Sequence, residues 1–126
     1  MKTQEKVKKV LIVEDDEDLN LLYRLYLQGE SYQIMQARNG KEGLEQVAAQ
    51  KPDLIILDMI MPVMDGEEFL EKLRFEKKVT DVPVIIASVN DRIPASLIEK
   101  TKVRSVLRKP FAIETLLREI EAALKG

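Results

Sequence analysis

The chain has 126 residues, of which 45% are hydrophobic and 33% are charged, which suits one globular domain and argues against disorder. A net charge of −2 gives no electrostatic support for nucleic-acid binding, so we expect no nucleic-acid partner. The sequence contains neither cysteine nor histidine, which excludes disulfides, thiol nucleophiles, Cys or His metal ligands and a phosphohistidine carrier. No apolar run approaches the roughly 20 residues of a membrane span, and no signal-peptide core follows Met1, so we expect a cytoplasmic protein without membrane insertion.

The first third of the chain predicts a strand, a helix and a second strand. Residues 10–13 are an apolar run, and the five residues that follow it, 14–18, are all acidic. The next apolar residues recur at the spacing of a helix with one buried face: Leu19, Leu22, Tyr23 and Tyr26. Residues 16–18 are explained as the N-cap and first-turn acids of this helix. Residues 32–37 alternate between apolar and polar side chains, which is typical of a strand at a sheet edge.

The middle of the chain contains the strand around which we expect the rest to be organised. Asn39-Gly40 turns the chain into a short helix, whose predicted buried side consists of Leu44, Val47 and Ala48. Residues 54–57, Leu-Ile-Ile-Leu, predict a strand buried on both faces, as in a parallel sheet. This strand ends at Asp58, and the next eight residues contain proline and Asp-Gly, which are loop signals.

The last third of the chain adds three helices and two strands. Apolar residues at helical spacing mark a helix around 69–73, and residues 83–88 form a fourth strand, which ends in a polar residue, Ser88. A helix is expected over 92–101 with its proline in the first turn, followed by a short strand at 105–109. The clearest helix is the last, over 113–124. Strands and helices alternate five times, which predicts an α/β fold with a parallel sheet covered on both sides.

In a parallel sheet the carboxyl ends of the strands meet at one edge, where open α/β sheets bind ligands. That edge collects Glu14 and Asp15, Asp58, Ser88 and Lys109. Each alone has an ordinary explanation, such as a loop-capping acid, a strand-ending serine or a surface lysine. Three carboxylates at one point nevertheless need a cation, because each pair at 4 Å repels by roughly 4 kcal/mol. Oxygen ligands suit Mg²⁺, and a carboxylate beside a metal, an ammonium and a hydroxyl can accept a phosphoryl group.

These motifs resemble those of response-regulator receiver domains, the phosphoacceptor half of two-component signalling. The resemblance covers about residues 8–124, and its motifs are LIVED at 11–15, LDMIMPVMDG at 57–66, IAS at 86–88 and KPF at 109–111. It implies a flavodoxin-like, doubly wound sheet of five parallel strands in the order 2-1-3-4-5, with five helices. We expect residues 1–126 to form a single receiver domain.

The resemblance also implies a role for each acid. Asp58 would be phosphorylated from a phosphohistidine on a sensor histidine kinase or a histidine phosphotransfer protein. Asp15 would bind Mg²⁺ directly together with Asp58, Glu14 would act through a water, and the backbone carbonyl of Ile60 would be a further ligand.

Ser88 and Lys109 would contact the phosphoryl group, and the Lys109-Pro110 peptide bond would be cis. Such a domain assists its own phosphorylation and dephosphorylation without a separate catalytic output domain, so it is only marginally an enzyme. Because the chain stops just after the last helix, we expect a stand-alone receiver, either a monomer or a weak phosphorylation-dependent dimer. It would signal by protein contact, or pass on or sink the phosphoryl group.

Several residues depart from the usual receiver pattern on the surface through which receivers signal. Val106 replaces the usual Tyr or Phe, Val89 the usual Ala or Gly, and Lys102-Val103 the usual Gly-Ala. Valine has a limited χ1 and buries less area than tyrosine, so we expect a shallow conformational switch. Ile60 cannot hydrogen-bond a water whereas Asn90 could, so we also expect comparatively slow self-dephosphorylation.

Three other functions are alternatives. A haloacid-dehalogenase-type phosphatase also uses an Asp nucleophile on an α/β sheet, but it needs a second Asp where this chain has Ile60. A flavodoxin-like nucleotide binder needs Ser, Thr or Gly after the first strand, where acidic residues 14–18 would repel phosphate. A phosphorylation-independent pseudo-receiver usually lacks one of the key acids, and none is missing here.

Overall fold

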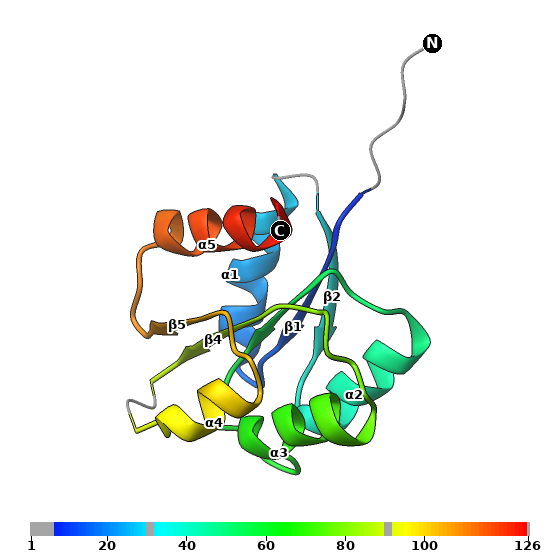
Figure 1. The fold of residues 1–126 in the computed structure, drawn as a ribbon. Coiled ribbons are helices and arrows are strands. Elements are labelled where there is room, and N and C mark those ends of the chain that lie inside the picture. The colour runs from blue at the N-terminus through cyan, green and yellow to red at the C-terminus, as the bar shows by residue number, and fades with distance from the viewer. Residues whose placement is uncertain (1–6, 30–31, 90–91, 126) are drawn as a thin grey trace.

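Strands and helices alternate along the computed structural model, which describes residues 7–29, 32–89 and 92–125 (Figure 1). The strands are β1 (Lys9–Val13), β2 (Gln33–Ala37), β3 (Leu54–Leu57), β4 (Val84–Ser88) and β5 (Ser105–Arg108). The helices are α1 (Glu17–Gln28), α2 (Gly40–Ala49), α3 (Gly66–Glu71), which continues into a π-helical segment η1 (Lys72–Glu76), α4 (Ala95–Lys100) and α5 (Ile113–Lys125). None of the helices in these described ranges is long and apolar enough to cross a membrane.

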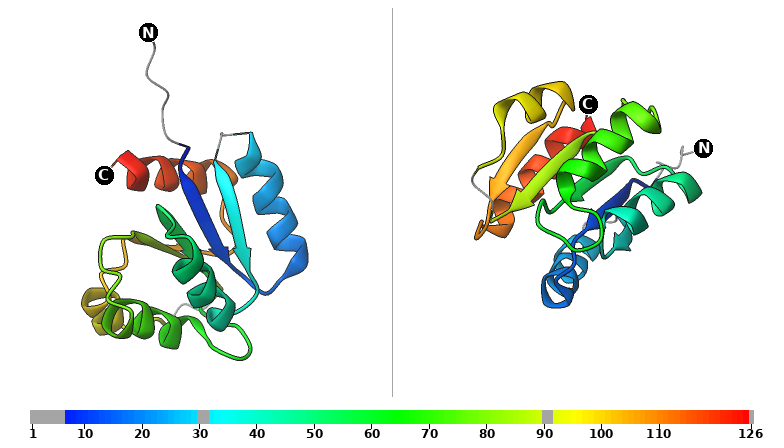
Figure 2. Two further views of the ribbon diagram at one scale, coloured as in Figure 1. Left: turned by 90° about the vertical axis from the view of Figure 1, so that its right-hand side faces the viewer. Right: turned by 90° about the horizontal axis from the view of Figure 1, so that it is seen from below.

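All five strands are parallel and lie in the order β2-β1-β3-β4-β5, which confirms the predicted topology. The left view of Figure 2 shows β1 and β2 running side by side in the same direction. The carboxyl ends of the first three strands are level, because Val13 pairs with both Ala37 and Leu57. The residues that follow β1 and β3 therefore lie next to each other at one edge of the sheet.

The sheet separates two hydrophobic cores, because side chains alternate between its faces. Helices α1 and α5 cover one face, and α2, α3 and α4 cover the other (Figure 1). Adjacent residues of the central strand accordingly enter different cores: Ile55 packs with the α2–α4 side and Ile56 with the α1 and α5 side. Strands β3 and β4 are buried along their whole length, whereas β2 alternates, as predicted for an edge strand.

Side-chain caps begin the first three helices, which leave the carboxyl edge of the sheet. Asp16 accepts hydrogen bonds from two N–H groups of α1, Asn39 caps α2 and Asp65 caps α3. The cap expected at Asp16 is thus confirmed. Gly66 follows the cap residue Asp65 and lies close to the backbone of Met59. A Cβ at Gly66 would lie only 2.6 Å from Met59 Cα. These caps fix the points at which the site loops end.

The buried face of α1 differs from the prediction. Leu22 and Tyr26, which the periodicity placed in the core, are 47% and 49% exposed. Asn20 is buried instead beside Tyr23, and its Nδ2 donates to the backbone carbonyl of Glu14 at 2.7 Å. Because α1 carries apolar residues around most of its circumference, periodicity alone does not select the face that the sheet covers.

Two further helices differ in detail. Ala48 of α2 is exposed, and the helix approaches α3 through Gly43, where a Cβ would lie 2.9 Å from Phe69 Cε1. The helix expected over 92–101 is shorter, since α4 begins directly after Pro94. Proline disfavours a helical conformation in the residue before it, which prevents an earlier start.

A buried arginine that the sequence did not single out joins two loops on the α3 and α4 side. Arg74, in η1, is 4% exposed. Its guanidinium donates to the backbone carbonyls of Thr101 at 2.7 Å, Val82 at 2.8 Å and Val79 at 3.0 Å. Burial lowers the pKa of this group. Arg74 therefore clamps the α3–β4 connection and the α4–β5 turn to the end of the third helix.

Candidate functional site

Three carboxylates meet at the carboxyl edge of β1 and β3. Glu14 and Asp15 follow β1, Asp58 follows β3, and oxygens of the three groups all lie within 4.8 Å of one another. Glu14 and Asp58 are buried, at 2% and 7% exposure, whereas Asp15 is exposed. Burial raises the pKa of Glu14 to about 7; the hydrogen bond from Lys109 opposes this rise, and the charge of Asp58 adds to it. The structure thus brings together the acids that the sequence placed at this edge.

One carboxylate oxygen of Asp58 is held by two donors. The Ser88 hydroxyl, at the buried end of β4, donates to Asp58 Oδ1 at 2.8 Å. The backbone N–H of Ile60 donates to the same oxygen at 3.2 Å, while the Ile60 side chain is exposed. Asp58 Oδ2 lies 3.6 Å from Nζ of Lys109. The two carboxylate oxygens therefore differ: Oδ1 accepts both of these hydrogen bonds, and Oδ2 faces Lys109.

The ammonium of Lys109 lies between two acids. Nζ is 2.7 Å from Glu14 Oε1 and 3.6 Å from Asp58 Oδ2, and the backbone N–H donates to the carbonyl of Ser88 at 2.9 Å. The Lys109-Pro110 peptide bond is cis, as the resemblance implied. The sequence placed Lys109 opposite Asp58, and the structure adds that its closer partner is Glu14.

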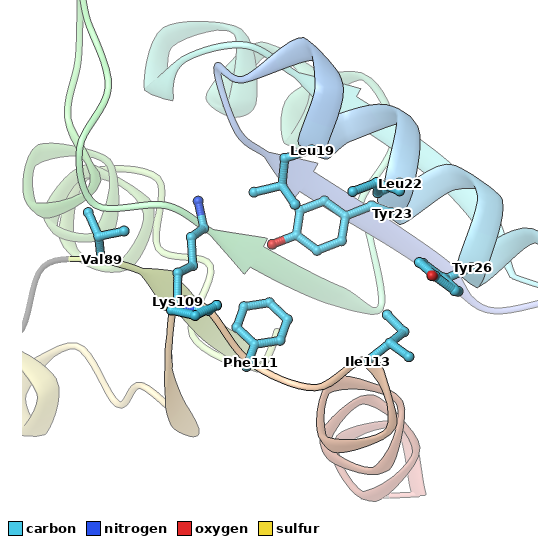
Figure 3. Close-up of a pocket in the computed structure, with 9 residues that line it drawn as sticks. Leu19, Leu22, Tyr23, Tyr26, Val89, Lys109, Phe111 and Ile113 are labelled. Atoms are coloured by element: carbon cyan, nitrogen blue, oxygen red, sulfur yellow. The ribbon is translucent and has the colours of Figure 1, made fainter.

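An apolar groove of about 530 Å³ adjoins this site between α1 and the loop that leads into α5 (Figure 3). Its lining residues are Leu19, Leu22, Tyr23, Tyr26, Val89, Lys109, Pro110, Phe111 and Ile113. Lys109 lines the groove and also contacts the acid cluster, so the groove and the cluster adjoin each other at this side chain. The sequence did not predict this surface, because it assigned Leu22 and Tyr26 to the core. The signal was the number of apolar residues in α1, which is greater than one buried face requires.

Of the residues that depart from the receiver pattern, Val89, Lys102 and Val106 are exposed, whereas Val103 is half-buried against the core on the α2–α4 side. Val106 on β5 and Val89 after β4 are 41% and 59% exposed. Lys102 has a φ of 55°, in the left-handed region that glycine adopts without strain, which explains why glycine is usual at this position. Asn90, predicted to hold a water near the phosphoryl group, lies outside the described residues.

Comparisons with known proteins agree with this fold. The family model for the response regulator receiver domain matches residues 10–121. The chain is 37% identical over 117 residues to the uncharacterized transcriptional regulatory protein YkoG of Bacillus subtilis, covering 92% of this chain and 50% of that protein. It is 30% identical over 119 residues to protein PilH of Pseudomonas aeruginosa, covering 94% and 98%. The chain therefore spans about half the length of YkoG and nearly all of PilH.

Solved structures give the same result. The Mg²⁺–BeF complex of response regulator TrrA from Thermotoga maritima has a TM-score of 0.83 at 29% identity, covering 94% of this chain and all of that one. Chemotaxis protein CheY4 of Vibrio cholerae has a TM-score of 0.85 at 29% identity, with the same coverage. The family match spans most of the chain, and the strand order is the one that the family implied. The chain therefore belongs to the response regulator receiver domains, the phosphoacceptors of two-component signalling.

Proposed function

We propose that Asp58 is the phosphoacceptor and that its Oδ2 attacks the phosphorus of a phosphohistidine. The observation that carries the proposal is the asymmetry of the carboxylate: Ser88 and the Ile60 N–H hold Oδ1, whereas Oδ2 faces Lys109. The bond from Oδ2 to phosphorus forms as the bond from phosphorus to the histidine nitrogen breaks. The electron pair of that bond stays on the donor imidazole.

The acid cluster fits Mg²⁺, because it offers only oxygen ligands and the chain has no His or Cys. Asp15 and Asp58 would hold the ion directly, Glu14 would act through a water, and the Ile60 carbonyl would be a further ligand. The bound ion supplies neutralisation of the charge on the transferring phosphoryl oxygens. The Mg²⁺–BeF complex of the similar TrrA structure supports this assignment.

Lys109 and Ser88 supply the remaining contacts. Phosphorylation adds negative charge at Asp58, which draws the Lys109 ammonium away from Glu14 and onto a phosphoryl oxygen. The Ser88 hydroxyl, no longer needed at the carboxylate, donates to another phosphoryl oxygen. These donors act by position and charge.

The phosphodonor is proposed to be a sensor histidine kinase or a histidine phosphotransfer protein that docks in the apolar groove. A helix laid in a groove is anchored by apolar side chains, which Leu22, Tyr26 and Ile113 provide here. Lys109 at the end of the groove brings such a helix beside Asp58. Leu22→Arg should therefore slow transfer from the protein donor and leave labelling by acetyl phosphate unchanged.

The remaining parts of the proposal concern context. A receiver of this charge and without a membrane-crossing helix in its described part fits the cytoplasm, without nucleic-acid contact of its own. Monomers or weak phosphorylation-dependent dimers would signal by protein contact or pass on the phosphoryl group. A phosphatase of the haloacid-dehalogenase type is not favoured, because exposed Ile60 occupies the position of its second acid.

The test is labelling by acetyl phosphate, followed by intact-protein mass spectrometry. Wild type should gain one phosphoryl group only with Mg²⁺, and Asp58→Asn should gain none. Asp15→Asn should need much more Mg²⁺, because it loses a charged ligand. Asp81→Asn, an exposed acid paired with Lys51 away from the site, is the matched control and should label normally. Stoichiometric labelling of Asp58→Asn, or of wild type in EDTA, would contradict the assignment.

A further inference from the structure

Val63, in the loop between β3 and α3, lies at the centre of a strained turn. Its φ is 70°, and the N–H of Met64 donates to the carbonyl of Pro62 at 2.7 Å. These are the features of a γ-turn with a positive central φ, which is the rarer and more strained of the two γ-turn forms. A branched Cβ makes this backbone conformation unfavourable for valine, whereas glycine and asparagine adopt it readily. The local backbone therefore does not explain why the chain has valine here.

The side chain of Val63 gains little packing within the chain that would offset this strain. Val63 is 76% exposed, the largest exposed fraction of any large hydrophobic residue in the described ranges. One exposed apolar side chain is ordinary at a protein surface, but this one coincides with a backbone that favours other residues. Strained residues of this kind cluster at functional sites. The combination indicates that the valine serves a contact outside its own chain.

The loop holds this turn close to the phosphoacceptor. The N–H of Gly66 donates at 3.0 Å to the carbonyl of Met59, the residue that follows Asp58. The first residue of α2 donates at 3.1 Å to the carbonyl of Met64, which also packs against the core on the α2–α4 side. Val63 is three residues from Gly66, a span of at most about 11 Å. Val63 therefore lies near Asp58 in a loop that is fixed on both sides of the turn.

Exposed apolar side chains border the acid cluster on two sides. Ile60, whose N–H donates to Asp58 Oδ1, is 54% exposed and belongs to the same loop as Val63. Val89 is 59% exposed and lines the groove together with Lys109 (Figure 3). The groove lies on the α1 and α5 side of the sheet, whereas the loop leads to α3 on the other side. Asp58 thus lies between two apolar surfaces.

The size of an ordinary protein interface indicates what covers the second surface. A protein donor must cover Asp58 to bring its phosphohistidine to the carboxylate. An interface of standard size covers about 800 Å² of each partner, a patch roughly 30 Å across. A donor that docks in the groove and reaches Asp58 therefore extends to Val63 on the far side.

We propose that Val63 is a specificity-determining residue for the protein donor: its side chain packs against an apolar surface beside the donor's phosphohistidine. This inference rests on the proposed transfer to Asp58. The fixed γ-turn holds the side chain outward before the donor arrives, so little conformational freedom is lost on binding. Donors with an apolar side chain at that place are favoured over donors with a charged one, because a charge there would lose water without gaining a partner.

The experiment measures the rate of phosphotransfer from purified, phosphorylated histidine kinases and phosphotransfer proteins of the same organism, divided by the rate of labelling by acetyl phosphate. Val63→Asn removes the apolar surface and suits the left-handed backbone, so it should be at least as stable as wild type in urea. With the donor that labels wild type fastest, the normalised rate of Val63→Asn should fall about three- to tenfold, the effect of losing a partly buried valine. Val63→Ile keeps the apolar surface and should retain or exceed the wild-type rate.

Lys78→Asn is the matched control. Lys78 is exposed and also has a positive φ, of 60°. It lies in the connection that leads to the start of β4, whereas Asp58 follows the end of β3. This substitution relieves the same backbone conformation away from the site, so it should leave the normalised rate unchanged.

The outcomes separate this inference from the proposed function. A wild type that neither acetyl phosphate nor any donor protein labels would overturn both, and one that only acetyl phosphate labels would overturn this inference. A wild type that both label, with a normalised Val63→Asn rate within about twofold of it or no lower than that of Lys78→Asn, would overturn only the contact at Val63. A Val63→Asn protein that is less stable than wild type would show that the valine serves the resting fold, and would also overturn the inference.

Discussion

Glu14→Gln should stabilise the metal-free protein at neutral and higher pH. Folding raises the pKa of Glu14 from 4.5 to about 7, because burial penalises its charged form. Below about pH 4.5 the group is protonated in both the folded and unfolded states and has no effect. Between about pH 4.5 and 7 the unfolded state ionises first, so the stability of wild type falls as pH rises. Above that range both states are ionised and the whole penalty remains.

The pKa change sets the size of the effect. Each pKa unit corresponds to about 1.4 kcal/mol, so the rise from 4.5 to about 7 gives a ceiling of about 3 kcal/mol. Glutamine does not titrate and escapes this penalty, and its amide oxygen still accepts from the Asp16 N–H. Its NH₂ group, however, can face the Lys109 ammonium 2.7 Å from the present oxygen. We therefore expect a gain of about 1–3 kcal/mol above pH 7 and a gain near zero at about pH 4.5.

Urea denaturation in EDTA, from about pH 4.5 to pH 8.5, measures this difference. Glu45→Gln, an exposed acid on α2, is the matched control and should show no gain that grows with pH. Excess Mg²⁺ should then stabilise wild type more than Glu14→Gln, because the variant has lost one carboxylate of the metal cluster. A variant that is no more stable than wild type at pH 8, or a gain independent of pH, would refute the reasoning.

Three other predictions concern stability, lifetime and signalling. Arg74→Met should lower the free energy of unfolding, measured in urea, by about 2–4 kcal/mol, because buried carbonyls lose their donor. Arg118→Met, at an exposed arginine, should change the free energy of unfolding by under about 0.5 kcal/mol. Equal effects of the two substitutions would contradict the role of Arg74 as a clamp. Ile60→Asn should shorten the half-life of the phosphorylated protein, since an amide near Asp58 can hold the attacking water; an unchanged decay of label would show that the water is held elsewhere. Because we expect Val106 to give a shallow switch, beryllofluoride with Mg²⁺ should change the affinity for a protein partner by less than about tenfold, or 1.4 kcal/mol. Large changes in amide chemical shifts across α4 and β5 on adding beryllofluoride and Mg²⁺ would contradict this prediction.

The sheet could be predicted because its signals are local. Residues 54–57 and 84–87 are apolar without interruption, which is typical of a strand buried on both faces, and the structure buries all of them. The cluster of Glu14, Asp15 and Asp58 followed from topology, since the ends of parallel strands must meet. The strand order that places β1 beside β3 came instead from the resemblance to receiver domains, and the structure confirms it.

The orientation of helices and of single polar groups could not be predicted in the same way. Periodicity placed Tyr23 correctly in the core but gave Leu22 the wrong environment, because both faces of α1 are apolar enough to be buried. Arg74 follows Leu70 and Leu73 at helical spacing, and that position was the available signal that its side chain points inward. Lys109 Nζ lies 2.7 Å from Glu14 and 3.6 Å from Asp58, and no sequence pattern specifies so small a difference between two distances.

The contacts that phosphorylation must change are unevenly placed around the site. The Lys109–Glu14 ion pair lies at the junction of the acid cluster with the α1 groove. The α4–β5 turn is held by contacts that do not involve the site, namely the Arg74 bond to Thr101 and a 2.7 Å ion pair between Lys100 and Glu71. A ligand shifts an equilibrium only through contacts that differ between its two states. We therefore expect phosphorylation to change mainly the contacts at the groove where the donor is proposed to dock, as in a receiver that passes on or sinks its phosphoryl group.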